Sequence, residues 1–155
     1  MNYFVPMNTL YNRQDLDGII NRLNQLTPAS ERKWGKMNVS QMLAHCNKSM
    51  ETALGENKIN RLFIGRIITP FIRKLVLGKK PFAKNSPTDK TYIFKGKHDF
   101  EFEMSRTITS INRFHEAGPS GSTTHPHPFF GHFNPDEWAV FQWKHLDHHL
   151  RQFGV

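Results

Sequence analysis

Three histidines lie within five residues near the carboxyl end of the chain, at positions 145, 148 and 149. On an α-helix, residues four apart lie about 40° apart on one face, one turn above the other. His145 and His149 have this spacing, and two imidazoles so placed can hold one divalent cation. The alternative is a histidine-rich helix surface that has no function. The choice depends on where the helix points these side chains and on which other ligands lie nearby.

The phase of the last helix, expected over residues 135–153, decides which of these histidines face the protein interior. At about 100° per residue, His149 points into the apolar face and His145 lies just inside its border, whereas His148 faces water. Gln152 falls in line with the other two histidines, where it could contact a ligand or a bound water. Two of the three histidines are therefore candidate metal ligands, and His148 is not.

A further histidine, His45, lies at the border of the apolar face of a helix expected over residues 38–54. Beside it run the polar residues Gln41, Ser49 and Thr52, which are typical of a cavity wall. A lone histidine at such a border is usually a hydrogen-bonded residue at the edge of the core. Border histidines on two helices of a bundle can also converge, and three histidines with an open position form a reactive metal site.

Helical periodicity with good caps predicts an all-α fold, because alternating strand patterns are nearly absent. Only residues 91–94 could form a short strand. An additional helical segment over residues 59–77 contains Pro70, which predicts one kinked helix or two short ones. A long loop follows over residues 78–97. The whole chain, residues 1–155, is expected to form a single domain with four main helices near residues 13–26, 38–54, 99–116 and 135–153.

A second loop, over residues 125–132, contains two prolines and leads directly into the last helix. Proline keeps this segment out of regular structure. We expect His127 and residues 129–130 to line the approach to the histidines on the last helix. His125 and His132 are expected to be exposed to solvent.

Composition is consistent with a single-domain protein that has 155 residues, 37% of them hydrophobic, and one cysteine. Cys46 alone cannot form an internal disulfide, which favours a reducing compartment. The first six residues lack the basic and apolar regions of a signal peptide, and no apolar run approaches the roughly 20 residues of a membrane span. These features predict a cytoplasmic protein without a membrane span.

Positive charge is concentrated in one segment. Of the 21 Lys and Arg residues, eleven lie between Lys58 and Lys97, with one acid, Asp89, among them. Such a segment can bind nucleic acid, a membrane surface or an anionic small molecule, or it can be a solvated face. Aromatic residues are not interleaved as a base-stacking platform requires, so nucleic acid is not favoured.

Three motifs occur together over residues 13–153: Trp34-Gly35-Lys36-Met37 leading to Gln41-Met42-Leu43-Ala44-His45, the loop His127-Pro128-Phe129-Phe130-Gly131, and Glu137-Trp138 leading to His145-Leu146-Asp147-His148-His149-Leu150-Arg151-Gln152-Phe153. With them the chain resembles the DinB-like (YfiT-like) superfamily, in a bacterial branch of it. The final motif is specific to that superfamily, whereas the helix at residues 59–77 is not.

The resemblance implies a DinB-like four-helix bundle in the order up-down-down-up, often dimeric, that holds a divalent metal, nickel or zinc. Carried over by position, the ligands are His45, His145 and His149. Further residues are expected to support these ligands or to line the pocket beside them, namely Gln152, His127, Gln41, Ser49 and Trp138. Characterised relatives include isomerases and metal-dependent transferases that use low-molecular-weight thiols such as bacillithiol or mycothiol.

These observations favour one functional hypothesis and leave alternatives open. The first is a metal-dependent transferase acting on a small-molecule substrate, since a divalent metal binds a low-molecular-weight thiol as its thiolate at neutral pH. The basic segment could bind carboxylates or phosphates of an anionic thiol. One alternative is a hydrolase that uses metal-bound water, and another is a basic binding module without catalysis. A histidine cluster with no function would leave the purified protein without metal.

Overall fold

The computed structural model describes residues 7–60 and 63–155, and over these residues the fold is all-helical, as predicted, with no strand. The two short 3-10 helices are η1 (Lys90–Tyr92) and η2 (Gly118–Gly121). The α-helices are α1 (Arg13–Leu23), α2 (Val39–Ala53), α3 (Phe63–Leu77), α4 (Phe100–Ala117) and α5 (Pro135–Gln152).

The two helices that carry the candidate ligands begin in capping boxes. At the start of α2, the Asn38 side chain accepts from the backbone N–H of Gln41, whose side chain accepts from the backbone N–H of Asn38. Asn134 and Glu137 form the same reciprocal pair at the start of α5. Each box satisfies two backbone donors that a helix start leaves free, so both helices begin where the sequence predicts.

Residues 91–94, the one segment whose sequence could have formed a short strand, do not form one. The Asp89 carboxylate accepts from the backbone N–H of Thr91 at 2.8 Å, and the chain turns into η1. Tyr92 is thereby directed inward, where its hydroxyl lies 2.8 Å from the hydroxyl of Thr52. A local hydrogen bond from side chain to backbone has replaced the extended conformation that β-branched and aromatic residues favour.

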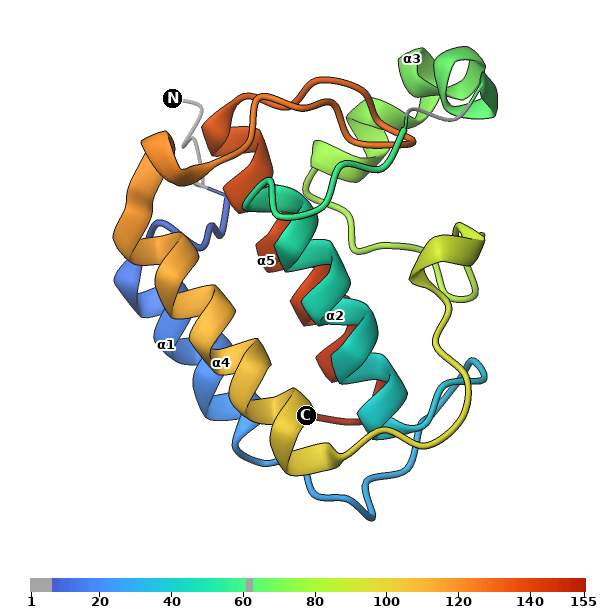
Figure 1. Ribbon diagram of the computed structural model, residues 1–155, viewed down its shortest axis with the longest axis vertical. Helices are drawn as coiled ribbons and strands as arrows, with labels where there is room; N and C mark the ends of the chain where they lie inside the picture. The colour runs from blue at the N-terminus through green and yellow to red at the C-terminus, as the bar shows by residue number, and fades with distance from the viewer. Residues whose placement is uncertain (1–6, 61–62) are drawn as a thin grey trace, which may run out of the picture.

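Four of the helices form the body of the molecule. Helix α2 packs against α4 and α5, and α1 packs against the same two helices (Figure 1). The apolar stripes of all four helices meet in one core, as amphipathic helices require. The largest fully buried core side chains are Trp138, Phe114, Leu10, Leu16, Ile19, Leu23, Met42, Leu43, Met50, Ile111, Leu146 and Leu150.

Helix α3 lies outside this body and contacts α5 (Figure 1). It is one helix from Phe63 to Leu77 with Pro70 inside it, and residues 61–62 of the expected 59–77 segment lie outside the described residues. Two cations attach it. Lys144 of α5 donates to the carbonyls of Leu75, Val76 and Gly78, and Arg73 of α3 donates to both carboxylate oxygens of Glu137 at 2.7 Å.

None of the helices in the described ranges combines the length and the apolar character needed to cross a lipid bilayer.

Candidate metal centre

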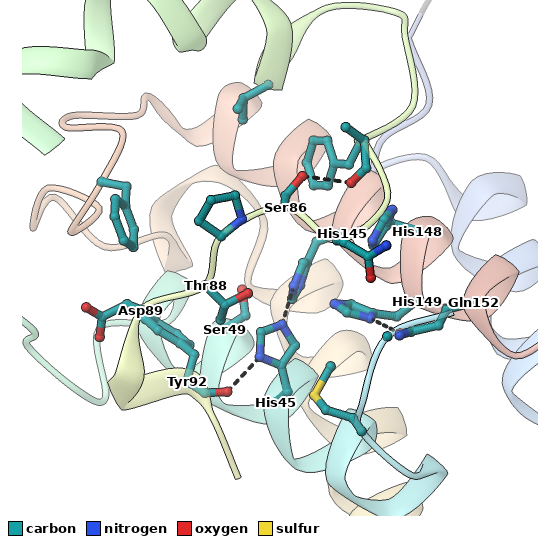
Figure 2. A pocket seen from close by; sticks show the side chains of 18 of the residues that line it. His45, Ser49, Ser86, Thr88, Asp89, Tyr92, His145, His148, His149 and Gln152 are labelled. Carbon is teal, nitrogen blue, oxygen red and sulfur yellow. Dashed lines mark hydrogen bonds between the residues drawn. The ribbon is translucent and has the colours of Figure 1, made fainter. Parts of the chain in front are cut away.

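The three predicted ligands converge in the space between α2 and α5. His45 comes from α2, and His145 and His149 come from successive turns of α5; all three are buried. One ring nitrogen from each lies within 4.8 Å of the others. Figure 2 shows the three imidazole rings close together, with His45 coming from α2 and the other two from α5. The cluster could hold a metal ion.

Two of the histidines are fixed through the ring nitrogen that faces away from the cluster. His45 donates its Nδ1–H to the carbonyl of Tyr92 at 2.8 Å, and His149 donates its Nδ1–H to Oε1 of Gln152 at 2.8 Å. The Gln152 amide in turn donates to the carbonyl of Trp34 at 2.8 Å. These bonds set the tautomer of both rings and leave each Nε2 as a bare lone pair, which is the ligating form.

His145 is the histidine with an unmet requirement. Its Nε2 lies 2.8 Å from the Nε2 of His45, and its buried Nδ1 has no hydrogen-bond partner. Since the His45 proton is on Nδ1, the His145 ring donates its Nε2–H to the Nε2 of His45 when no cation is bound, and its own Nδ1 remains an acceptor without a partner. A divalent cation would take the place of this shared proton and bind both Nε2 lone pairs. The donor set of three neutral nitrogens therefore fits a metal such as nickel or zinc.

The surroundings keep these imidazoles neutral. Burial lowers the pKa of His45, and it lowers the pKa of His145 and His149 well below the usual value of 6.5, with repulsion among the histidines adding to the effect. Only the neutral ring can donate a lone pair to a metal. The cluster is therefore in its ligating protonation state at neutral pH.

His148 lies differently from the prediction, which had it facing water. It is half-buried, with its ring centroid 5.7 Å from that of Trp34 and 5.9 Å from that of Phe82. Lys144, on the same side of α5, is also buried, by the end of α3. The helical phase itself is right, but the chain before α2 and the segment after α3 cover this face of α5. His148 is not a member of the three-histidine group.

The five supporting residues predicted from the sequence divide into two sets. Gln152, Ser49 and His127 line a cavity at the histidine cluster. Gln41 does not line it, because its side chain is held in the capping box and by the carbonyl of Gly96. Trp138 is fully buried in the core and also lies outside the cavity lining.

The histidines of the 125–132 loop have separate environments. His127 is buried, its Nδ1 accepts from the backbone N–H groups of Phe129 and Phe130, and burial lowers its pKa to about 3. His132 is exposed, as predicted. His125 is half-buried instead of exposed, and its Nε2 donates to the carbonyl of Ile59. The loop therefore places one neutral histidine beside the cavity.

A cavity of about 510 Å³ opens from the histidine cluster. Residues of the 78–97 loop cross its front, as the labelled Ser86, Thr88 and Asp89 show in Figure 2. Helical periodicity locates the lining residues of α3 and α5 on their helices but does not show that they meet at one cavity, and Phe82 lies in a loop with no periodicity. The lining residues missed from the sequence include Leu75, Val76, Phe82, Phe141, Tyr92 and His148.

The arrangement has the chemistry of an open metal site. Three nitrogen ligands occupy one side, and the described residues supply no carboxylate or thiol to the group. Cys46, the neighbour of His45, is fully buried, and burial raises the pKa of its thiol. Such a site leaves coordination positions for a small molecule that reaches it through the cavity.

Neither a curated protein nor a solved structure matches this chain. One family model matches residues 8–154, which is almost the whole length, and the chain therefore belongs to the DUF1569 family of proteins of unknown function.

Proposed function

We propose that the protein binds one divalent metal, nickel or zinc, through His45, His145 and His149 and acts as a metal-dependent transferase on a low-molecular-weight thiol. The observation that supports this most is the pair of Nδ1–H groups on His45 and His149 that are already bonded, because they leave both Nε2 lone pairs free in a group where one ligand atom of each histidine lies within 4.8 Å of the others. When bound, the metal would lower the pKa of a thiol or, in the alternative hydrolase, of water.

The chain's own residues would divide the remaining tasks. The three imidazoles hold the metal, while the carbonyl of Tyr92 and the amide of Gln152 fix two of the rings. Phe141, whose ring is parallel to that of His145 at 5.9 Å, excludes water from one side of the site. Exclusion of water strengthens the attraction between the metal and an anionic ligand.

Several finer features belong to the same proposal. They are the DinB-like relationship with its up-down-down-up helix order, a single domain, a cytoplasmic location and a homodimer. The packing of α1 and α2 against both α4 and α5 is compatible with such a bundle. The lone buried Cys46 is compatible with a reducing compartment.

Metal analysis of protein that carries no histidine tag tests the proposal. We expect one nickel or zinc ion per chain in the wild type and in His132→Ala, which removes an exposed histidine, and none in His145→Ala. Adding a small thiol to the nickel-loaded protein should produce a thiolate-to-nickel charge-transfer band. Wild-type protein that retains no metal after loading would contradict the proposal, and metal retention without the thiolate band would leave only the hydrolase alternative.

A further inference from the structure

The inner wall of the cavity is apolar. Phe141 lies parallel to the His145 ring, and its centroid lies 5.5 Å from that of Phe130 and 5.9 Å from that of Phe82. Val76, from the last turn of α3, is a buried member of the same wall. An apolar surface thus begins at the metal-binding histidines and continues toward α3.

Three of the buried polar side chains that line the cavity already have partners. The Ser49 hydroxyl is bonded to the Gln142 side chain at 3.2 Å, and the Nδ1 of His127 accepts two backbone N–H groups. Both ends of the Gln152 amide are also in use. A ligand rich in hydroxyl or amide groups would lose its hydrogen bonds to water here and find few replacements, which weakens its binding.

Free polar groups lie at the mouth of the cavity. The lining residues Lys36, Asn85 and Thr88 are exposed, and the last two belong to the 78–97 loop that crosses the front of the cavity. The cavity therefore has three zones: nitrogen ligands on one inner side, an apolar wall beside them, and a polar mouth. The volume of about 510 Å³ is far larger than a metal ion with its waters needs, and it is in the range of cavities that hold whole small molecules.

We infer that this cavity takes a ligand that carries one metal-binding head, such as a thiolate, carboxylate or hydroxamate, on an unbranched alkyl or aryl body. The head would meet the histidine cluster and the body would lie along Phe141, Phe130 and Val76. The inferred position of the ligand's head rests on the proposed metal site, whereas the position of its apolar body does not. It selects an apolar substrate over the sugar- and peptide-containing thiols that the same metal chemistry would also accept.

Titration calorimetry with linear alkyl hydroxamates, from two to eight carbons, tests the inference on zinc-loaded protein without a tag. Each buried methylene contributes about 0.8 kcal/mol, so affinity should rise about fourfold per added carbon until the apolar wall is covered. A hydroxamate of equal length whose chain contains ether oxygens should bind no more tightly than the two-carbon compound. Equal affinity across the alkyl series would overturn the inference while leaving the metal site intact.

Two variants locate the effect. Val76→Thr places a hydroxyl in the apolar wall and should reduce the gain per carbon to less than about twofold. Val39→Thr makes the same change at a buried core position that does not line the cavity, and it should leave the gain unchanged. An equal loss in both variants would contradict the placement of the body against α3.

Alkyl amides, which have the same chains but no chelating head, separate this inference from the metal proposal. If the wild type retains no zinc, the metal proposal fails, and the amide series still measures the apolar wall directly. A rise in amide affinity with chain length would then support the apolar body alone. Amide affinity that does not change with chain length in such protein would overturn the inference as well.

Discussion

Helix α2 carries two buried polar clusters, which differ in how fully their polar atoms are bonded and in whether they line a cavity. The first, between α2 and α4, consists of Asn47, Glu103 and Thr107. Asn47 donates to the Glu103 carboxylate at 2.7 Å, and Thr107 donates to the Asn47 side chain at 2.8 Å. Arg106 and His98 contact the same carboxylate from outside. Every polar side chain in this α2–α4 cluster has a partner within the protein.

The second cluster, between α2 and α5, consists of the three histidines. Its outer contacts are equally well made, but it leaves the buried Nδ1 of His145 without a partner and brings two Nε2 atoms together. It also faces a cavity, whereas Asn47, Glu103 and Thr107 are absent from the cavity lining. A saturated cluster stabilises helix packing, and a cluster with unmet requirements beside a cavity has the features of a binding site.

The largest effect expected is loss of the metal when an inward-facing histidine is removed. In His149→Ala, one of three ligands is missing, and we expect no metal to remain after dialysis. His148→Ala removes the neighbouring ring, which lies outside the three-histidine group, and should keep one metal per chain. Metal content by mass spectrometry gives the comparison. Loss in the second variant with retention in the first would require the site to be redrawn on the other face of α5.

The next largest effect should be on stability and should fall on the α2–α4 cluster. Asn47→Ala removes the two bonds that the Asn47 amide donates to Glu103 and the side-chain acceptor of the Thr107 hydroxyl, which should lower the free energy of unfolding by about 2 kcal/mol. In the metal-free protein, His145→Ala removes a ring whose Nδ1 has no hydrogen-bond partner. This substitution should therefore change the free energy of unfolding by less than about 1 kcal/mol. Urea unfolding measures both. Similar losses in the two variants would remove the distinction between a structural and a binding cluster.

A smaller effect is expected when the support of one ligand is removed. Gln152→Ala deletes the acceptor for the His149 Nδ1–H and should weaken metal binding by about 10- to 100-fold, as other supporting contacts do. Gln152→Glu keeps an acceptor oxygen and should recover most of the affinity. Competition with a chelating dye measures the change. Unaltered affinity in Gln152→Ala would show that the ring is held by packing alone.

Acid should lower the stability of the metal-free protein through the three buried histidines. The folded-state pKa values of His45, His145 and His149 lie below 6.5, so the unfolded chain takes up these protons first. Stability of the metal-free protein should therefore fall as pH drops below about 6.5, by up to about 1.4 kcal/mol per pH unit for each histidine. The slope of the free energy of unfolding against pH should be smaller in His145→Ala than in the wild type and unchanged in Asn47→Ala. An unchanged slope in His145→Ala would contradict this assignment.

The smallest effect tests the contact between the Trp34-Gly35 turn and Gln152. Gly35 has φ +82°, and a Cβ there would lie 2.5 Å from the Gln152 amide nitrogen. Gly35→Ala should cost about 1 kcal/mol of stability from its backbone and weaken metal binding less than Gln152→Ala does. Gly96→Ala is the matched control, because its φ is +79° and no atom lies within 4 Å of its Cβ. Only the first variant should alter metal affinity.

The sequence predicted those features of the fold that depend on residues close together in the chain, such as helix caps and helical periodicity. Capping boxes at Asn38 and Asn134 and the 3.6-residue period located α2 and α5, and with them the three histidines. The parts it missed depend on tertiary contacts. Nothing in the period of α5 indicates that Phe82 lies against His148, or that the end of α3 lies over Lys144. The cavity wall joins residues of α3, α5 and the 78–97 loop, and their meeting depends on how these segments pack on one another.

Lys144 connects the histidine cluster to the apolar wall of the cavity beside α3. It is the residue before His145 on α5, and its ammonium group binds the final carbonyls of α3, which carries Val76. A ligand body that displaces α3 would therefore move the residue next to His145 in the chain. With the proposed metal bound, we expect occupancy of the apolar wall to alter metal affinity. Such coupling is reciprocal: a metal that tightens binding of the ligand is itself held more tightly by that ligand, by the same factor.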